Sequence, residues 1–456
     1  MKAFSKSSLR WGVDVSKFND ALEKHLLPVA SKLGSNKILI SMRDGIIVAM
    51  PLIIIGSLFL VISGIAIPGW IEWLEAQGIQ PYLMKAVNGT FGLMGLVASF
   101  GVAHSIARQY NTDGVSAGII AMSAFLVVTP NVMTGDKVPE EAIPQIYMGS
   151  QGLFVALIIG IISGLIFQWF INRNIRIKMP DQVPPAVAQS FSALIPGAAI
   201  IILWLAVYIA LDNLPFGNIH ELIVNTLGVP LSLMGGSLIG TIILVGLNSA
   251  FWFVGIHGAN VVNAVMQPIW LKNIDENRLA YQANPHGDLP HIITQPFIDN
   301  FVFMGGGGST IGLVIVIAIL AFKKRSSKIT KTMAPLTLMP GIFNINEPTL
   351  FGLPVVLNVR LIILFVLAPM INATITYFAM SSGLVHLTNG TAMPWTIPPI
   401  ISGFLATGHY SGSLVQIVCI IIDILLYYLF YRAMEKYNLY LEDKEANGIK
   451  ETEEPK

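Results

Sequence analysis

The sequence contains a single cysteine, Cys419, among 456 residues. One cysteine excludes an intrachain disulfide framework and any metal site built from several cysteines. Cys419 stands in the apolar run Val-Cys-Ile-Ile-Ile, which lacks the exposed, electropositive surroundings that a reactive thiolate needs. We interpret it as a small core residue. No spacing typical of a metal or cofactor site occurs elsewhere, so none is predicted.

Charged residues are also scarce: they make up 12% of the chain, and hydrophobic residues make up 54%. Soluble domains have roughly 25% charged residues, so this composition predicts an all-α polytopic membrane protein. A net charge of +1 gives no reason to expect a nucleic-acid partner. Apolar stretches long enough to span a bilayer lie near residues 46–67, 86–107, 115–133, 152–171, 194–211, 233–256, 308–322, 361–380 and 414–431. We predict about ten transmembrane helices in total.

Shorter apolar pieces interrupted by Gly, Pro or polar residues predict two re-entrant helical hairpins; they lie at 258–271, 292–304, 333–357 and 394–406. Residues 1–43 contain no cleavable signal and form a predicted cytoplasmic arm, with an amphipathic helix over 15–33. Residues 438–456 are rich in Glu and Lys and are predicted to be disordered. Lys and Arg concentrate before the first span and in alternate loops, which predicts that both termini are cytoplasmic.

One carboxylate, Glu347, lies between Pro340 and Pro348, with Pro354 shortly after, in a stretch otherwise suited to a bilayer interior. Proline breaks helices, and broken backbone at membrane depth is tolerated where it lines a cavity. A carboxylate there is costly unless it serves a substrate or a partner charge. The segment therefore predicts a binding site. The structural alternative is that Glu347 pairs with Arg360 or caps a broken helix.

His257 is the second candidate site residue. It lies in the segment Trp252-Phe253-Val254-Gly255-Ile256-His257-Gly258-Ala259-Asn260, where the flanking glycines would let a ligand or another backbone approach closely. A buried histidine with a structural role is the alternative.

These two segments resemble the signatures of the membrane subunit, enzyme IIC, of phosphotransferase-system permeases of the lactose, cellobiose and diacetylchitobiose family. The first match is Asn344-Ile345-Asn346-Glu347-Pro348, followed by Phe351-Gly352 and Pro354. The second is the histidine-bearing segment at 252–260, which the family places opposite its glutamate. The resemblance covers most of the chain, from about Leu33 to Tyr437.

The resemblance implies a scaffold and dimerisation half, residues 44–230, and a transport half, residues 231–437, which moves like an elevator. It also implies a homodimer in the bacterial cell membrane (the inner or plasma membrane) that imports a β-linked disaccharide. In such a system a separate IIB protein, itself supplied by IIA and HPr, donates a phosphoryl group from a cysteine to the 6-hydroxyl of the sugar. Glu347 and His257 are then the predicted catalytic residues.

Five further residues are predicted to bind the sugar. Asn344 and Asn346 combine donor and acceptor groups, as polyol recognition requires, although either amide could instead satisfy backbone groups near the prolines. Trp252 and Trp395 could stack on a pyranose ring, or anchor the protein at the membrane interface. Asn300, which follows Asp299, could contact sugar or end a hairpin.

The run Gly305-Gly306-Gly307-Gly308-Ser309-Thr310 lacks the lysine of a phosphate-binding P-loop and leads into an apolar helix without a preceding strand. It predicts close packing or a hinge.

The functional alternative to phosphotransfer is a cation-coupled sugar symporter, in which Glu347 or His257 would carry a proton.

Overall fold

The computed structural model describes residues 28, 31–64, 69–134, 140–180, 182–213, 218–253, 256–285, 287–353 and 359–446. Nearly all of its regular structure is helical, as predicted. Two short antiparallel strands form an unpredicted hairpin, in which Val132 pairs with Ala142. Most of the predicted arm at 1–43 and residues 447–456 lie outside the described residues.

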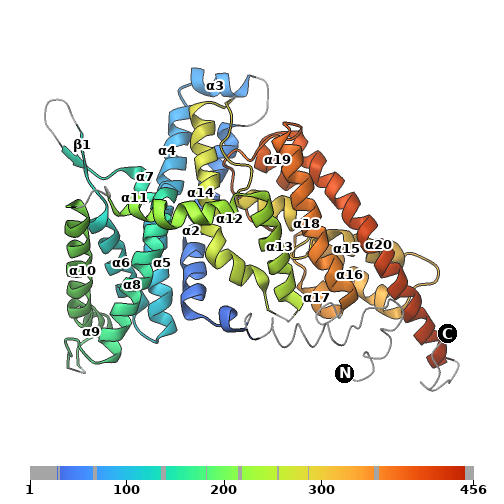
Figure 1. Cartoon of the computed structure of the whole chain (residues 1–456), viewed down its shortest axis with the longest axis horizontal. Helices are drawn as coiled ribbons and strands as arrows, with labels where there is room; N and C mark the ends of the chain where they lie inside the picture. Colours follow the sequence, from blue (N-terminus) through green and yellow to red (C-terminus); the bar gives the residue numbers. More distant parts are fainter. Residues whose placement is uncertain are drawn as a thin grey trace.

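The first half of the chain is a bundle of apolar helices (Figure 1). Its core consists of buried aliphatic and aromatic side chains such as Ile53, Phe91 and Phe125. Its elements are α2 (Lys37–Ser63), α3 (Trp70–Ala76), α4 (Gln80–Phe91), α5 (Met94–Gln109), α6 (Gly114–Val128), β1 (Val132–Thr134), β2 (Glu140–Ala142), α7 (Gln145–Met148), η1 (Ser150–Gly152), α8 (Leu153–Asn172), α9 (Pro185–Ser192) and α10 (Leu194–Asp212).

The second half mixes long helices with very short ones, and two further apolar clusters form its core. Its elements are α11 (Ile219–Ile223), η2 (Val224–Gly228), α12 (Val229–Gly235), α13 (Leu238–Phe253), α14 (Gly258–Ala283), η3 (Phe297–Val302), α15 (Ile311–Ala321), α16 (Lys328–Ile342), α17 (Glu347–Gly352), α18 (Val359–Ser381), α19 (Ile401–Thr407) and α20 (Tyr410–Ala446). In Figure 1, α11 and α12 run across the molecule between the two groups of helices.

Among the described residues, six helical segments are long and apolar enough to cross a membrane, and the bent pair 219–235 and 238–252 would make seven. They are 37–63, 80–109, 150–172, 185–212, 361–381 and 410–446. Helices α6 and α15, predicted as spans, are apolar but shorter. The predicted span 233–256 is bent by 77° where α12 meets α13.

Two predicted boundaries differ from the structure. The expected short piece at 258–271 is the first part of the continuous helix α14, which runs on to Ala283 with Pro268 inside it. The expected disordered tail at 438–456 begins as helix, because α20 continues to Ala446. Glu435 and Glu442 hold this end of α20 by accepting hydrogen bonds from the backbone N–H groups of Ser327 and Lys328, where α16 begins.

Helix α14 also connects the two halves through buried charged groups. Arg278 pairs with Asp275 at 2.7 Å, with only 3% and 5% of their side chains exposed. Arg278 donates to Asn88 on α4, and Ser150 on η1 donates to Asp275. A buried ion pair is stable only when its remaining hydrogen-bonding groups are satisfied, so these partners fix α14 against the first half.

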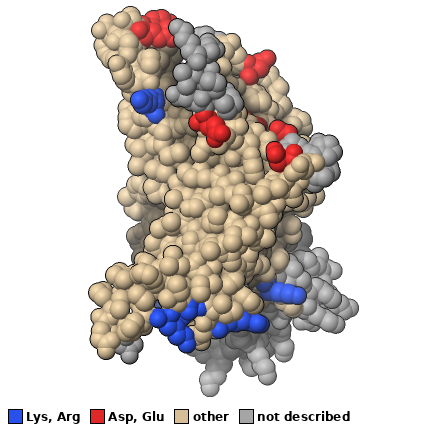
Figure 2. Space-filling model, turned by 90° about the vertical axis from the view of Figure 1, so that its left-hand side faces the viewer, with Lys and Arg blue, Asp and Glu red and all other residues tan. Residues whose placement is uncertain are grey.

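Charge is distributed unevenly between the two ends of the molecule. Figure 2 shows acidic side chains near the upper end of one face and most of its basic side chains at the lower end. Glu72 and Glu75, on α3 at the top of Figure 1, are exposed. Arg173 and Arg176 are exposed in the connection that follows α8. This separation agrees with the loop charges noted in the sequence.

Helices α2 and α5 cross closely because glycines face each other at the contact. A Cβ atom on Gly45 would lie 2.5 Å from the backbone nitrogen of Val102, and one on Gly101 would lie 2.5 Å from the Gly45 oxygen. Neither position has room for a side chain.

We predict that Gly45→Ala lowers the thermal unfolding temperature of the purified protein, because overpacking costs about 1–3 kcal/mol. Gly89→Ala in α4 is the matched control, since no atom lies within 4 Å of its added Cβ. Equal unfolding temperatures for Gly45→Ala and the wild type would contradict the close crossing.

Candidate functional site

The backbone is broken at the glutamate, as the prolines predict. Helix α16 contains Pro340 and ends at Ile342, and α17 begins at Glu347 with Pro348 in its first turn. Glu347 is exposed. Its place in the first turn also fits the alternative of a carboxylate at a helix N-terminus. Arg360, the other proposed partner, has a side chain outside the described residues.

Asn344 holds the broken segment in place. Its backbone is left-handed, with φ of 62°. Its Oδ1 accepts a hydrogen bond from the Gly305 N–H at 2.6 Å. Its Nδ2 donates to the carbonyls of Trp395 and Ile397 at 2.6 and 3.0 Å. Both ends of this buried amide therefore bind backbone, which favours the structural use of Asn344 over direct sugar recognition.

The six residues 305–310, which we call the glycine loop, pack against this segment. Asn346 donates from Nδ2 to the Gly307 carbonyl at 2.7 Å. The loop has positive φ at Gly305, Gly306, Gly308 and Ser309. A Cβ on Gly306 would lie 2.7 Å from Cγ of Asn346. The loop is thus tightly packed against the site segment, one of the two structural roles that its sequence predicts.

His257 lies at the start of α14, next to Trp252 at the end of α13; their ring centroids are 4.3 Å apart. His257 is exposed. Desolvation nevertheless lowers the pKa of His257, the Glu347 carboxylate opposes that effect, and the positive charge of Arg43 adds to it. The Glu347 carboxylate therefore favours the charged form of His257, as expected if the two residues face one site.

The two tryptophans differ in accessibility. Trp252 is 6% exposed and belongs to the apolar cluster that contains Leu350 of α17. Its Nε1 is so near the glycine loop that a Cβ on Gly307 would lie 2.9 Å away. Trp395 is 50% exposed, and its carbonyl is held by Asn344. Of the two, Trp395 offers the more open ring.

Asn300 lies in η3. It is 2% exposed, its backbone carbonyl accepts a hydrogen bond from Gln416 of α20 at 2.7 Å, and its side-chain Oδ1 is buried without a partner. No hydrogen bond described in the structure joins it to Glu347 or His257. Its role in sugar binding stays a prediction.

Two residues near His257 were not singled out from the sequence. Arg43, in the first part of α2, influences the charge on His257. The sequence feature that could have indicated Arg43 is a basic residue near the start of an apolar helix. Asn248 of α13 lies against the start of α14, where a Cβ on Gly258 would be 1.9 Å from its carbonyl oxygen. That contact joins residues on different helices and has no local sequence signal.

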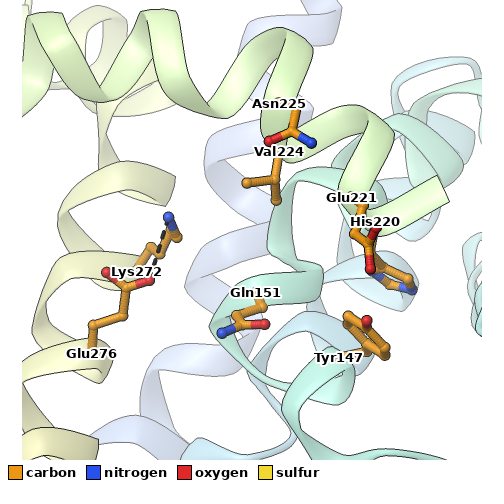
Figure 3. A pocket seen from close by; sticks show the side chains of 8 residues that line it. All are labelled: Tyr147, Gln151, His220, Glu221, Val224, Asn225, Lys272 and Glu276. Carbon is orange, nitrogen blue, oxygen red and sulfur yellow. Dashed lines mark ion pairs between the residues drawn. The ribbon is translucent and has the colours of Figure 1, made fainter. Parts of the chain in front are cut away.

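A separate cavity of about 300 Å³ lies where α14 faces α7, η1, α11 and η2. Figure 3 shows its polar lining, with an ion pair between Lys272 and Glu276 on one side and His220 against Tyr147 on the other. None of the predicted site residues lines it. Within the described part of the chain, no group of three or more His, Cys, Asp or Glu side chains could hold a metal ion.

Comparison with known proteins agrees with the two sequence motifs. The family model for phosphotransferase system EIIC matches residues 43–369. The lichenan permease IIC component of Bacillus subtilis (strain 168) is 42% identical over 452 residues, covering 97% of this chain and 98% of that protein. The cellobiose-specific EIIC component of Geobacillus stearothermophilus is 44% identical over 435 residues, covering 92% and 95%.

A solved structure is also similar. The crystal structure of the transporter ChbC, the IIC component from the N,N'-diacetylchitobiose-specific phosphotransferase system, has a TM-score of 0.86 and 39% identity. The similarity covers 92% of this chain and 99% of that one. The family resemblance predicted from the two motifs is therefore confirmed, and the chain belongs to the EIIC family of the phosphotransferase system, whose members are multi-pass membrane permeases for sugars.

Proposed function

We propose that this chain imports a β-linked disaccharide, of the cellobiose or diacetylchitobiose type, and presents its 6-hydroxyl for phosphorylation. The observation that carries the proposal is the exposed Glu347 at the break between α16 and α17, together with the exposed His257 beside Trp252 at the start of α14. The relatives named above, which handle lichenan, cellobiose and diacetylchitobiose by their names, support the substrate class.

Glu347 is the proposed base. Its carboxylate can accept hydrogen bonds from sugar hydroxyls and take the proton of the 6-hydroxyl as that oxygen attacks phosphorus. The new bond joins phosphorus to the sugar oxygen, the phosphorus–sulfur bond breaks, and the cysteine leaves as a thiolate. The chain itself contributes orientation and proton transfer, and the partner supplies the phosphoryl group.

The sugar contacts follow from accessibility. His257 would hydrogen-bond one hydroxyl, and the half-exposed Trp395 ring would stack on a pyranose face. Trp252 would complete the pocket wall next to His257. The described bonds of Asn346 use only its Nδ2, which leaves its Oδ1 for a hydroxyl, whereas Asn344 would support the site through the backbone.

The phosphoryl donor is proposed to be a phosphocysteine on a separate IIB protein, supplied in turn by IIA and HPr. Cys419 is fully buried, so it cannot reach a soluble partner. We also propose that residues 44–230 form the scaffold and dimer interface of a homodimer, and that residues 231–437 form the transport half.

In the proposed membrane orientation the basic end of Figure 2 is cytoplasmic, as are both termini, because Lys and Arg are retained on that side. The bent pair and the shorter helices α6 and α15 would join the six long segments as spans, bringing the count close to the predicted ten. The short elements η3, α17 and α19 would belong to the two re-entrant hairpins.

A cation-coupled symporter is the rival function, because intramembrane carboxylates and histidines also carry protons. The deciding experiment is disaccharide uptake into membrane vesicles with and without phosphoenolpyruvate and the soluble phosphotransfer proteins. Accumulation of sugar phosphate only when they are present supports phosphotransfer. Accumulation of unmodified sugar driven by an ion gradient would replace that proposal with symport.

We predict that Glu347→Gln lowers the rate of sugar phosphorylation by about 10²–10⁴-fold, because it keeps the shape and removes the base. The measurement is phosphorylation of the disaccharide by the reconstituted system. Glu75→Gln, at an exposed glutamate of α3, is the control and should retain the wild-type rate. A well-folded Glu347→Gln protein with normal phosphorylation would remove Glu347 from the mechanism.

For His257 we predict that sugar affinity without IIB falls in the order wild type, His257→Gln, His257→Ala. Glutamine can still pair with a hydroxyl, whereas alanine leaves it unpaired at a cost of about 1–3 kcal/mol, or roughly 5- to 150-fold in affinity. Isothermal titration calorimetry of the disaccharide with each purified protein gives the three affinities. His386→Ala, at an exposed histidine between α18 and α19, is the control. Three equal affinities would assign His257 a structural role only.

A further inference from the structure

The glycine loop has a second anchor on the side away from Asn344. The Ser309 hydroxyl donates to Oδ2 of Asp423 at 2.6 Å, and Asn372 donates to the same oxygen at 2.9 Å and to Ser309 Oγ at 2.8 Å. These residues come from the loop, α20 and α18. All three are fully buried, and Asp423 lies in the apolar run Ile-Ile-Ile-Asp-Ile-Leu-Leu of a membrane-spanning helix.

The hydrogen bonds are distributed unevenly over the Asp423 carboxyl group. Both donors converge on Oδ2, while Oδ1 is buried and has no partner. Oδ1 of Asn372 is also buried without a partner. None of the ion pairs in the described residues involves Asp423. An ionised carboxylate left in this way would pay a large desolvation cost with no opposite charge to offset it.

A neutral carboxylic acid suits these contacts better than a carboxylate does, because an unpaired O–H costs less to bury than an unpaired charge. Its carbonyl oxygen accepts, which fits the two bonds to Oδ2, and its hydroxyl oxygen carries a proton, which removes the charge and turns Oδ1 into a donor. A hard cation fits less well, because it takes about six or more oxygen ligands, whereas only the two Oδ1 atoms of this cluster are uncommitted.

We propose that Asp423 is held as a neutral carboxylic acid with its proton on Oδ1, and that it is a positioning residue for the sugar site through the glycine loop. The second part rests on the proposed function, because it requires the Glu347 segment to bind sugar. The first part does not.

The physical connection from Asp423 to the site is short and stiff. Asp423 binds Ser309, and Tyr427 of the same helix donates to the Gly308 carbonyl at 2.7 Å. Gly305 donates to Asn344 and the Gly307 carbonyl accepts from Asn346. Both asparagines lie within three residues of Glu347. A Cβ on Gly308 would lie 2.1 Å from the Phe365 ring, so the loop cannot shift without disturbing α18.

The protonation state is tested by infrared difference spectroscopy of the sugar-free wild type against Asp423→Asn. The expected result is a carbonyl band of a protonated carboxylic acid that is present in the wild type, shifts in D₂O and is absent from the variant. Asp443→Asn, at an exposed aspartate of the same helix, is the control and should keep the band. Absence of such a band in the wild type would overturn the neutral acid.

The positioning role is tested by disaccharide binding without IIB. Asp423→Asn reproduces a neutral side chain with one acceptor and one donor group, so its affinity should stay close to the wild type. Asp423→Leu removes the hydrogen bonds of this side chain to Ser309 and Asn372. Ser309→Gly removes only the hydroxyl and suits the φ of 52° at that position, so it remains informative if the leucine variant does not fold.

We predict that Ser309→Gly weakens sugar affinity about 5- to 150-fold, because it leaves buried polar groups without hydrogen-bond partners. Asp423→Leu should have a similar effect if that variant folds. If Ser309→Gly binds like the wild type, or if Asp423→Asn loses as much as Asp423→Leu, the positioning role of a neutral Asp423 is wrong. If the wild type itself does not bind a β-linked disaccharide, the proposed function fails, and the infrared result still decides the state of Asp423.

Discussion

The site depends on satisfying backbone hydrogen bonds where the chain is interrupted between α16 and α17. Backbone groups that packing removes from water must find partners within the protein. The Asn344 amide takes this role: it accepts from Gly305 and donates to the carbonyls of Trp395 and Ile397. Three irregular segments are thereby tied together around one side chain, which holds the break that exposes Glu347.

The same constraint explains why the supporting residues are buried and the proposed chemical groups are exposed. Asn344 and Asn346 are 5% and 4% exposed, and their bonds to backbone orient the segment. Glu347 and His257 are open to solvent. A catalytic group held by packed neighbours keeps its geometry without using its own hydrogen-bonding capacity. That division leaves the carboxylate and the imidazole available for a sugar.

The glycine loop links the site segment to two long helices of the second half. It is fixed to the site segment by Asn344 and Asn346 and to the helices α18 and α20 through Asp423. Positive φ at four of its residues and the absence of side chains allow these close approaches. Under the proposed positioning role, a movement of α20 relative to the loop would change the geometry of the site and thereby alter sugar binding.

Composition alone determined that this is a helical membrane protein, because a chain with so few charges cannot cover a soluble surface. Prolines around one carboxylate likewise located the broken segment and Glu347, since proline removes a backbone donor wherever the chain folds. The structure also showed that α14 continues through Pro268. Tertiary structure decided what local patterns cannot encode: the backbone role of Asn344 and the contact of Ser309 with Asp423. The bonds of Asn344 to Gly305 and of Ser309 to Asp423 join groups 39 and 114 residues apart in the chain, brought together only by the packing of helices against one another.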